Sequence, residues 1–323
     1  MDNEIHICLA PDNDYAVHAG VTIASIIANA AKDDYLHFYI LDGDLTLENK
    51  EKLMSITTNA VRRGRAAMME FVPIHLSDKM PITRLPIAAF YRLKVPDLIK
   101  ADKCLYLDSD TVVLRSLKTL WETPLNGKTI GLVADCNDAF QKQKWGLDFY
   151  GNSGVLLMDL KRYRRLNGWQ ECLDFCKQAW EKITLGDQDI LNNVFAGDIE
   201  PLDRRWNAHE GAESRTKFKG NKAYLQSLDN PFIIHYIGSL KPWISSAPRF
   251  DKTHYYFRYL RQTPWKKQVI QAFRKRYVWD VFRGKKETYV LLFHIKIMKI
   301  KKGRLFLLGI PVKQLTKAGG AEH

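Results

Sequence analysis

Long apolar runs are missing from this sequence. No uninterrupted apolar stretch in the 323 residues approaches the roughly 18 residues needed to cross a bilayer. The first residues, MDNEIHICLAPDND, lack a basic stretch followed by an apolar one, so we expect no signal peptide. Internal repeats and low-complexity linkers are also absent. The length of 323 residues allows one large domain or two ordinary ones and is ample for a buried core.

Cysteine is scarce and irregularly placed. The chain has five, an odd number, and most of them lie in apolar runs. We interpret them as small core residues of a protein in a reducing cytosol. Cys172 and Cys176 are one helical turn apart, but no second Cys/His pair lies nearby, so core packing is favoured over a zinc site.

Acidic residues are nearly absent from one region. Residues 258–317 contain 17 Lys and Arg but only two acidic residues, a net +15; the whole chain carries +13, so the remainder carries −2. Aromatic residues such as Trp265, Tyr277 and Trp279 are interleaved with these cations. This composition is typical of segments that lie on an anionic membrane. We expect a body of residues 1–257 and a membrane-association region of residues 258–323.

Two other interpretations of the basic region stay open. It can be a small subdomain packed on the body, or it can bind nucleic acid, although no known nucleic-acid motif is present. Within it, residues 289–300 and 304–312 are predicted to form short strands joined at Lys302-Gly303.

Apolar periodicity in the first part of the chain predicts alternating strands and helices. The expected strands are 5–10, 37–41 and 69–74, and the expected helices are 15–31 and 46–60. This order indicates an α/β fold with a parallel, doubly wound sheet. Ligands of such sheets bind at the carboxyl ends of the strands.

The pattern continues beyond residue 85. A helix over 86–94 is expected to lead into a strand that ends at Asp108. Strands are predicted at 129–134, 155–160 and 232–237, a long helix at 161–183, and a short helix beginning at Asp187.

An Asp-x-Asp tripeptide, Asp108-Ser109-Asp110, follows the fourth predicted strand. If the strand geometry persists, both carboxylates point to the same side because side chains alternate along a strand. They repel unless something positive lies between them, and a divalent cation with oxygen ligands meets that need. Considered alone, the tripeptide is more often a turn with solvated acids.

Six motifs in collinear order, over roughly residues 4–245, resemble glycosyltransferase family 8. They are LAPDNDYA, FYRLKVPDLI, KCLYLDSDTVV, GNSGVLLMDLKRYR, GDQDILN and IIHYIGSLKPW. The family contains glycogenin and the bacterial lipopolysaccharide galactosyl- and glucosyltransferases, and the latter group is the closest in pattern. The resemblance implies a GT-A fold, in which helices flank a mostly parallel twisted sheet. It also implies a nucleotide-sugar donor, usually UDP-linked, Mn2+ dependence with Mg2+ as a possible substitute, and retention of anomeric configuration.

The same resemblance places the family's metal ligands on Asp108, Asp110 and His235, with Ser109 in the donor-binding set. Two carboxylates and an imidazole, completed by diphosphate oxygens, form a mixed site that suits Mn2+ better than Ca2+. Without the aspartate pair, His235 in its apolar strand would be interpreted as a hydrogen-bonded core histidine.

Other family positions fall on donor-binding residues. Ala10, Asp12 and Tyr15 correspond to the uridine site, where Tyr15 can stack on the base and Asp12 can accept from a base N–H. The alternative is a helix-capping Asp12 and a packing Tyr15, and both roles can hold together. Gly238 and Lys241 match the diphosphate contacts, by close backbone approach and by a point charge respectively.

The sugar-ring positions of the family correspond to Asn152, Asp187 and Gln188. Asp135 falls where sugar and acceptor meet. Arg92 is expected to reach the donor sugar or phosphate. The alternative for this arginine is a surface ion pair. Gln188 is an amide and a poor nucleophile, so attack on the same face is favoured over a covalent intermediate, although Asp187 and Asp189 are adjacent.

The expected activity is transfer of glucose or galactose from a UDP-sugar to a saccharide or glycolipid acceptor. We expect the lipopolysaccharide or lipooligosaccharide core, or another surface glycan, as acceptor, and a cytoplasmic enzyme on the inner face of the membrane. Residues 81–87 depart from the hydroxyl-rich family pattern, which leaves the acceptor the least defined. A non-enzymatic nucleotide-sugar-binding protein and a nucleic-acid binder are the alternatives.

Overall fold

The computed structural model describes most of the chain. The described residues are 4–76, 86–211, 217–239, 241–244, 252–274, 279–283, 287–292, 295–301, 304–307 and 310–314. Most of the predicted acceptor loop, residues 81–85, and the Lys302-Gly303 joint lie outside them.

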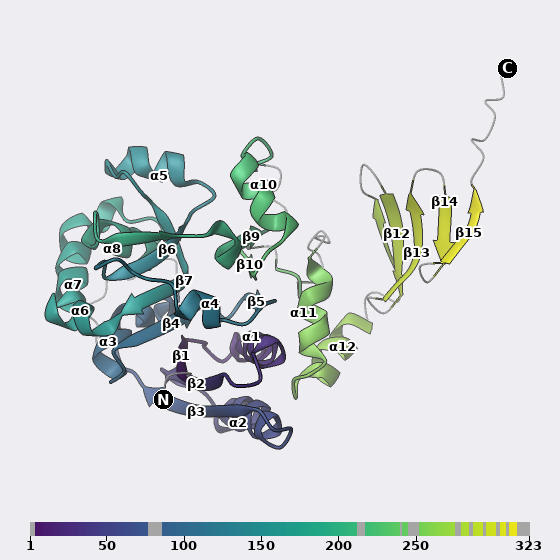
Figure 1. Ribbon diagram of the computed structural model, residues 1–323, viewed down its shortest axis with the longest axis horizontal. Helices are drawn as coiled ribbons and strands as arrows, with labels where there is room; N and C mark the ends of the chain where they lie inside the picture. Colours follow the sequence, from purple (N-terminus) through teal and green to yellow (C-terminus); the bar gives the residue numbers. More distant parts are fainter. Residues whose placement is uncertain are drawn as a thin grey trace.

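A seven-stranded sheet forms the centre of the protein (Figure 1). Its order is β3-β2-β1-β4-β7-β6-β8. The pairs among β3, β2, β1 and β4 are parallel, as is β6 with β8, whereas β7 runs antiparallel to both its neighbours. The expected α/β fold with a mostly parallel sheet is therefore confirmed. The strands are β1 (Glu4–Leu9), β2 (Tyr35–Asp42), β3 (Ala66–Pro73), β4 (Lys103–Leu107), β6 (Ile130–Ala134), β7 (Gly151–Asp159) and β8 (Ile199–Leu202).

Helices cover both faces of this sheet, and each face has its own apolar core. Side chains from β1 and β2, including Ile7 and Phe38, pack with α1, α2 and Trp265 on one face. Cys8, Tyr106 and Cys172 belong to the core on the opposite face, beneath η1, α6, α7 and α8. The helices are α1 (Ala16–Asn29), α2 (Leu47–Val61), η1 (Ile87–Lys94), α3 (Val95–Leu98), α4 (Lys118–Trp121), α5 (Asp138–Trp145), α6 (Leu160–Arg165), α7 (Gly168–Ala179), η2 (Trp180–Lys182), α8 (Asp187–Val194), η3 (Arg204–Asn207) and α10 (Lys222–Asp229).

A small three-stranded sheet pairs a strand near residue 235 with a strand that directly follows the Asp-x-Asp turn. The order is β5-β10-β9, made of β5 (Thr111–Val113), β10 (Ile233–Tyr236) and β9 (Ala208–Glu210). In the antiparallel pair of β10 with β5, His235 lies opposite Thr111, one residue after Asp110. This register places distant parts of the sequence beside the Asp-x-Asp turn.

Two predicted helices differ from the structure. The expected helix over 161–183 is three pieces, α6, α7 and η2, because Asn167 adopts a left-handed conformation (φ 52°) between the first two. At Gly168 an added Cβ would lie 2.6 Å from the Tyr163 ring, so the chain turns where a glycine allows close contact. The expected helix over 86–94 is a 3-10 helix followed by α3.

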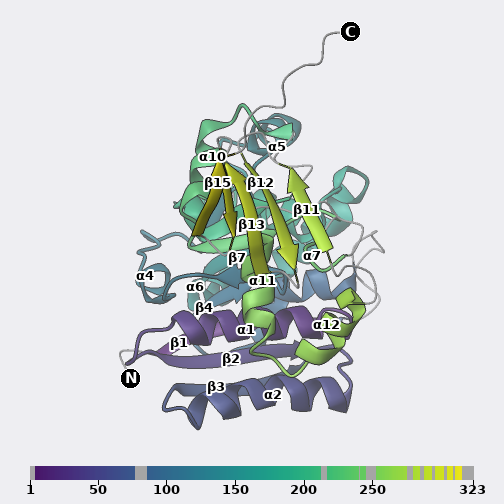
Figure 2. The ribbon, with the colours of Figure 1, turned by 90° about the vertical axis from the view of Figure 1, so that its right-hand side faces the viewer.

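The body continues past residue 257. Helix α11 (Thr253–Leu260) crosses the expected boundary, and Leu260 and Trp265 are buried. Figure 2 shows α11 and α12 (Lys266–Arg274) in front of α1. No helix within the described ranges is long and apolar enough to cross a membrane.

The carboxyl-terminal region contains an antiparallel sheet in the order β11-β12-β13-β14-β15. The segment predicted over 289–300 is divided between β12 and β13. The segment predicted over 304–312 is divided between β14 and β15. The strands are β11 (Trp279–Arg283), β12 (Glu287–Leu292), β13 (Ile295–Lys301), β14 (Arg304–Leu307) and β15 (Ile310–Gln314).

The Asp-x-Asp turn is attached to α1 by buried hydroxyls. Thr22 Oγ1 lies 2.7 Å from the Thr111 carbonyl oxygen and 3.0 Å from that of Ser109, and can donate to either. Ser25 Oγ accepts from the backbone N–H of Val113 at 2.9 Å. Helix α1 therefore fixes the backbone on both sides of the Asp-x-Asp turn.

Replacing Thr22 by Val removes this buried donor and keeps the side-chain shape. We expect the free energy of unfolding to fall by about 1–3 kcal/mol in urea denaturation. The control is Thr58→Val, because the Thr58 hydroxyl makes one exposed bond to Met54 and its loss should change stability by less than about 0.5 kcal/mol. Equal losses from the two substitutions would contradict the role of Thr22.

Candidate active site

A pocket of about 320 Å³ lies at the carboxyl ends of β1 and β4. Ten of the predicted site residues line it: Ala10, Asp12, Tyr15, Arg92, Asp108, Ser109, Asp110, Asn152, Asp187 and Gln188. Pro86, Ala88, Ala89, Tyr106, Ser153 and Leu185 complete the wall. His235, Lys241 and Asp135 lie behind this wall and contact it, as described below.

Asp108, Asp110 and His235 converge at one end of the pocket. One ligand atom from each lies within 4.8 Å of the others. His235 Nε2 is 3.2 Å from Asp110 Oδ1 and 3.7 Å from Asp108 Oδ2. Gly154 packs against this group, and an added Cβ there would lie 2.2 Å from the His235 ring. Any larger residue at position 154 would therefore collide with the His235 ring.

Lys241 neutralises one of the two carboxylates. Its Nζ lies 2.6 Å from Asp110 Oδ2 and donates also to the Tyr236 carbonyl oxygen. Burial by itself would raise the pKa of Asp110, but Lys241 and His235 hold that pKa well below its usual range. Burial likewise opposes the charge of Lys241, and Asp110 raises the lysine's pKa. Gly238, which has a left-handed φ of 81°, lies on the same loop.

Arg92 neutralises the other carboxylate and is buried. It forms ion pairs with Asp108 (2.8 Å) and Asp187 (3.0 Å), and donates to the Ser153 carbonyl oxygen at 2.6 Å. Its guanidinium also lies 4.6 Å from the centre of the Tyr106 ring. The alternative of a surface ion pair is therefore wrong, because this arginine is 5% exposed and its ion pairs are internal.

A chain of amide groups connects His235 with the expected sugar positions. Asn207 Oδ1 lies 2.9 Å from His235 Nδ1, and Asn207 Nδ2 donates to Asn152 Oδ1 at 2.9 Å. Asn152 Nδ2 donates to Gln188 Oε1 at 2.8 Å. Both Asn152 and Gln188 donate to Asp135 Oδ2 at 3.3 Å. Sequence reasoning missed Asn207, which belongs to none of the motifs and gains its position from η3 beside β10.

The two aspartates that flank Gln188 have different surroundings. Asp189 is fully buried and accepts from Trp145, Tyr150 and the backbone N–H groups of Thr184 and Leu185, so it holds a loop in place. Asp187 accepts from Ser153 Oγ at 2.7 Å and pairs with Arg92. Burial raises the pKa of Asp187 to about 6, although Arg92 acts in the opposite direction.

Asp12 and Tyr15 form the opposite wall. Asp12 Oδ1 accepts from the Tyr15 backbone N–H at 2.8 Å in the turn before α1, whose N-cap residue Tyr15 makes no side-chain capping bond. The Tyr15 ring meets Trp243 edge-on at 6.1 Å, and Trp243 stacks on His18 at 3.6 Å. These contacts hold the tyrosine at the mouth of the pocket.

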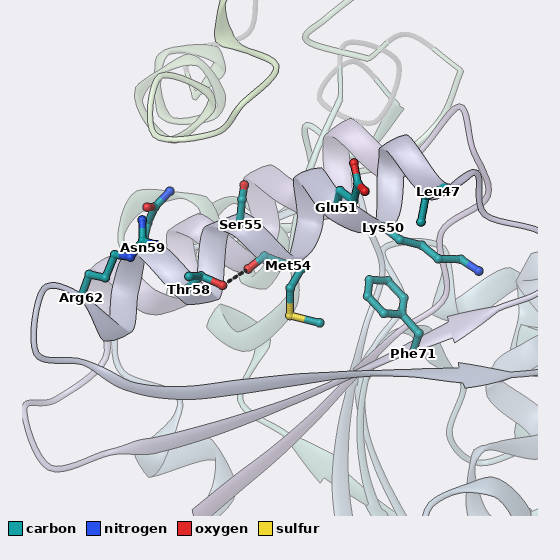
Figure 3. A pocket seen from close by; sticks show the side chains of 9 residues that line it. All are labelled: Leu47, Lys50, Glu51, Met54, Ser55, Thr58, Asn59, Arg62 and Phe71. Carbon is teal, nitrogen blue, oxygen red and sulfur yellow. Dashed lines mark hydrogen bonds between the residues drawn. The ribbon is translucent and has the colours of Figure 1, made fainter.

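A second hollow, of about 560 Å³, lies between α2 and β3. Figure 3 shows Met54, Leu47 and the Phe71 ring around it. None of the predicted site residues lines it. The candidate active site is therefore the smaller pocket at the strand ends.

Comparison with known proteins shows the family of this chain. The model of glycosyl transferase family 8 matches residues 6–247, three quarters of the chain. This chain belongs to glycosyltransferase family 8. General stress protein A of Bacillus subtilis (strain 168) is 28% identical over 284 residues, covering 82% of this chain and 96% of that protein. A lipopolysaccharide 1,2-glucosyltransferase of Escherichia coli (strain K12) is 27% identical over 290 residues, covering 84% of each.

Solved structures share the fold. The galactosyltransferase LgtC, in complex with donor and acceptor sugar analogs, superposes with a TM-score of 0.70 and 26% identity, over 82% of this chain and all of that chain. The bifunctional glycosyltransferase WbbM has a TM-score of 0.71 at 22% identity. The match covers 84% of this family 8 chain and 52% of WbbM, so this chain spans about half the length of WbbM.

The pKa of Asp187 predicts a pH dependence of stability. Its folded value of about 6 exceeds the ordinary 3.8, so the folded protein binds more protons between these values and loses stability as the pH rises from about 4 to 6. In urea denaturation, the stability of the wild type relative to Asp187→Asn should fall by on the order of 2–3 kcal/mol over that range.

The control is Asp174→Asn, on an exposed face of α7. Hydrogen bonds from Gln170 and Lys177 lower the pKa of Asp174, so its substitution should give a slight slope of the opposite sign. A wild-type stability that rises from pH 4 to 6 relative to Asp187→Asn would contradict the assignment.

Proposed function

We propose that this family 8 enzyme transfers a hexose, glucose or galactose, from a UDP-sugar to a saccharide acceptor with retention of anomeric configuration. The observation that carries this proposal is the convergence of Asp108, Asp110 and His235 beside a pocket lined by Asp12, Tyr15 and Gln188. It combines a metal-binding donor set with groups that can hold a nucleotide and a sugar.

The three converging side chains fit Mn2+, with Mg2+ as a possible substitute. Two carboxylates and an imidazole match its preference for oxygen and nitrogen ligands. Asp108, Asp110 and His235 would hold the ion, which as a Lewis acid and template supplies charge stabilisation to the diphosphate. With the ion bound, the hydrogen bond between His235 Nδ1 and Asn207 Oδ1 would keep the proton on Nδ1 and leave the Nε2 lone pair for the metal.

The chain's own residues bind and orient the donor. Tyr15 at the pocket mouth offers its ring to the uracil, and Asp12 Oδ2 can accept from a base N–H while Asp12 Oδ1 accepts from the Tyr15 backbone N–H. Lys241, now on Asp110, provides positive charge where negative charge develops on the departing UDP. Arg92 borders the donor pocket, and its ion pairs also hold Asp108 and Asp187 in place.

The surroundings of Gln188 support attack on the same face of the sugar. A covalent intermediate needs a carboxylate at the anomeric carbon. Asp189 is occupied by four donors, and Asp187 is paired with Arg92 and Ser153. The Gln188 amide and the linked Asn152 are thus left to hold the sugar ring, and Asp135 to receive the acceptor hydroxyl.

The proposed acceptor is the lipopolysaccharide core or another surface glycan. The support is the likeness to lipopolysaccharide 1,2-glucosyltransferases of Escherichia coli, at 27% and 28% identity. An acceptor of this kind is made at the inner face of the cytoplasmic membrane, where the net charge of +15 in residues 258–317 would favour anionic lipid. Peripheral attachment through this region is part of the proposal.

A donor screen tests the reaction. Purified protein is incubated with UDP-glucose, UDP-galactose and other nucleotide sugars, first with Mn2+ and then with a chelator, and released hexose is measured. We expect one UDP-hexose to be consumed with Mn2+ only. Asp110→Asn should lower the rate by about 100-fold or more, because the ion that would neutralise the diphosphate loses a carboxylate ligand.

The control for the donor screen is Asp14→Asn, which alters an exposed acid near the pocket and should leave the rate unchanged. Tight UDP-hexose binding without turnover would instead indicate a binding protein. RNA binding at physiological salt without any UDP-hexose affinity would overturn the proposal.

Asn207 provides a second test, directed at metal affinity. Asn207→Ala removes the acceptor for His235 Nδ1 and should weaken Mn2+ binding by about 10–100-fold in calorimetry. Asn207→Asp keeps an acceptor and should restore most of that affinity. The control is Asn193→Ala, since that side chain donates to a carbonyl within its own helix. Unchanged affinity in Asn207→Ala would show that His235 needs no such partner.

A further inference from the structure

A second group of metal-ligating side chains lies behind the sugar positions. Asp135, Cys136 and His209 each offer one ligand atom, and these atoms lie within 4.8 Å of one another. Asp135 and Cys136 follow β6, and His209 is the middle residue of β9. This group shares no residue with Asp108, Asp110 and His235.

All three side chains of this group are buried, and one has an unused nitrogen. His209 is 2% exposed, and its Nε2 has no hydrogen-bond partner among the residues that the structure describes. A buried polar atom without a partner destabilises the fold, so a native structure usually supplies one. A cation bound by His209 would remove that destabilisation.

The donor set selects the metal. A thiolate, an imidazole and a carboxylate suit Zn2+, which takes three protein ligands and a fourth external one in tetrahedral geometry. Mn2+ prefers oxygen ligands, so it favours the aspartate pair instead. Ligand atoms of a tetrahedral zinc site lie about 3.3–3.5 Å apart, as follows from bond lengths of about 2.0–2.3 Å. An inward movement of about 1 Å from the present spacing would be enough.

Charged groups around Asp135, Cys136 and His209 affect how favourably Zn2+ binds there. Arg204 lies nearby but pairs with Asp138 at 3.5 Å, and His209 faces His235 edge-on at 5.8 Å. Burial, followed by the Asp135 charge, raises the pKa of Cys136, so the free thiol keeps its proton. Zn2+ binding must displace this proton, and the cation compensates for the burial of the thiolate.

Occupation of this group would affect catalysis, an inference that rests on the proposed function. Asp135 Oδ2 accepts from both Asn152 and Gln188, the residues assigned to the sugar ring. A cation on Asp135 competes with these two amides and neutralises the carboxylate that faces the acceptor. We propose that Asp135, Cys136 and His209 form an inhibitory Zn2+ site, separate from the site of the catalytic metal.

Cobalt substitution detects this site without any activity measurement. The metal-free protein is titrated with Co2+, and a thiolate-to-cobalt charge-transfer absorption is recorded in the near ultraviolet. Asp108, Asp110 and His235 contain no sulfur, so of the two metal-binding groups only the one with Cys136 can give this absorption. We expect the absorption in the wild type, its loss in Cys136→Ala, and its weakening in His209→Ala.

Two controls separate this site from other metal binding. Cys176→Ser alters a buried cysteine of α7 and should keep the absorption. The double variant Asp108→Asn, Asp110→Asn should also keep it, which shows that the second site binds independently. If the donor screen fails but the absorption follows Cys136, the zinc site stands and the proposed function falls.

Inhibition is the second measurement. Zn2+ should lower the Mn2+-supported rate of the wild type, and Cys136→Ala should raise the zinc concentration for half-inhibition by at least about tenfold. No thiolate absorption in the wild type, or an absorption unchanged in Cys136→Ala, would overturn the site. Equal zinc sensitivity of the wild type and Cys136→Ala would overturn its inhibitory role.

Discussion

The repulsion between Asp108 and Asp110 is the constraint on which the rest of the site depends. At a separation under 4.8 Å, two carboxylates repel by on the order of 3–4 kcal/mol at an effective dielectric constant of about 20. Arg92 compensates Asp108, and Lys241 compensates Asp110. Each cation comes from a different segment, so the charge balance forms only when η1 and the loop after β10 pack onto the turn. The balanced site therefore exists only in the folded protein.

Close packing makes that charge balance possible. Thr22 and Ser25 of α1 hold the backbone on both sides of the turn, and Gly154 leaves room for His235 beside Asp108. Asn207 then donates to Asn152, and Asn152 donates to Gln188. The proposed metal-binding end and sugar-binding end of the pocket are therefore connected by hydrogen bonds.

Local sequence patterns predicted most of the body. Alternation of apolar strands with amphipathic helices indicated the α/β sheet, and the motifs around Asp108 and His235 indicated the family. The break at Asn167 was missed because an amphipathic pattern continues on both sides of it, while a single left-handed residue decides the turn. The antiparallel direction of β7 was also hidden, since strand direction depends on the connection and not on the apolar pattern.

The sequence by itself determined the fold class, the family and the chemical types at the site, because these follow from periodicity and from motifs of adjacent residues. Only the tertiary structure decided the partners. It buried Arg92 between two aspartates, used Asp189 to hold a loop, and placed Asn207 behind His235. It also brought His209 to Cys136 from a different strand. The physical reason is that hydrogen bonds and ion pairs depend on distances of about 3 Å between side chains that are far apart along the chain.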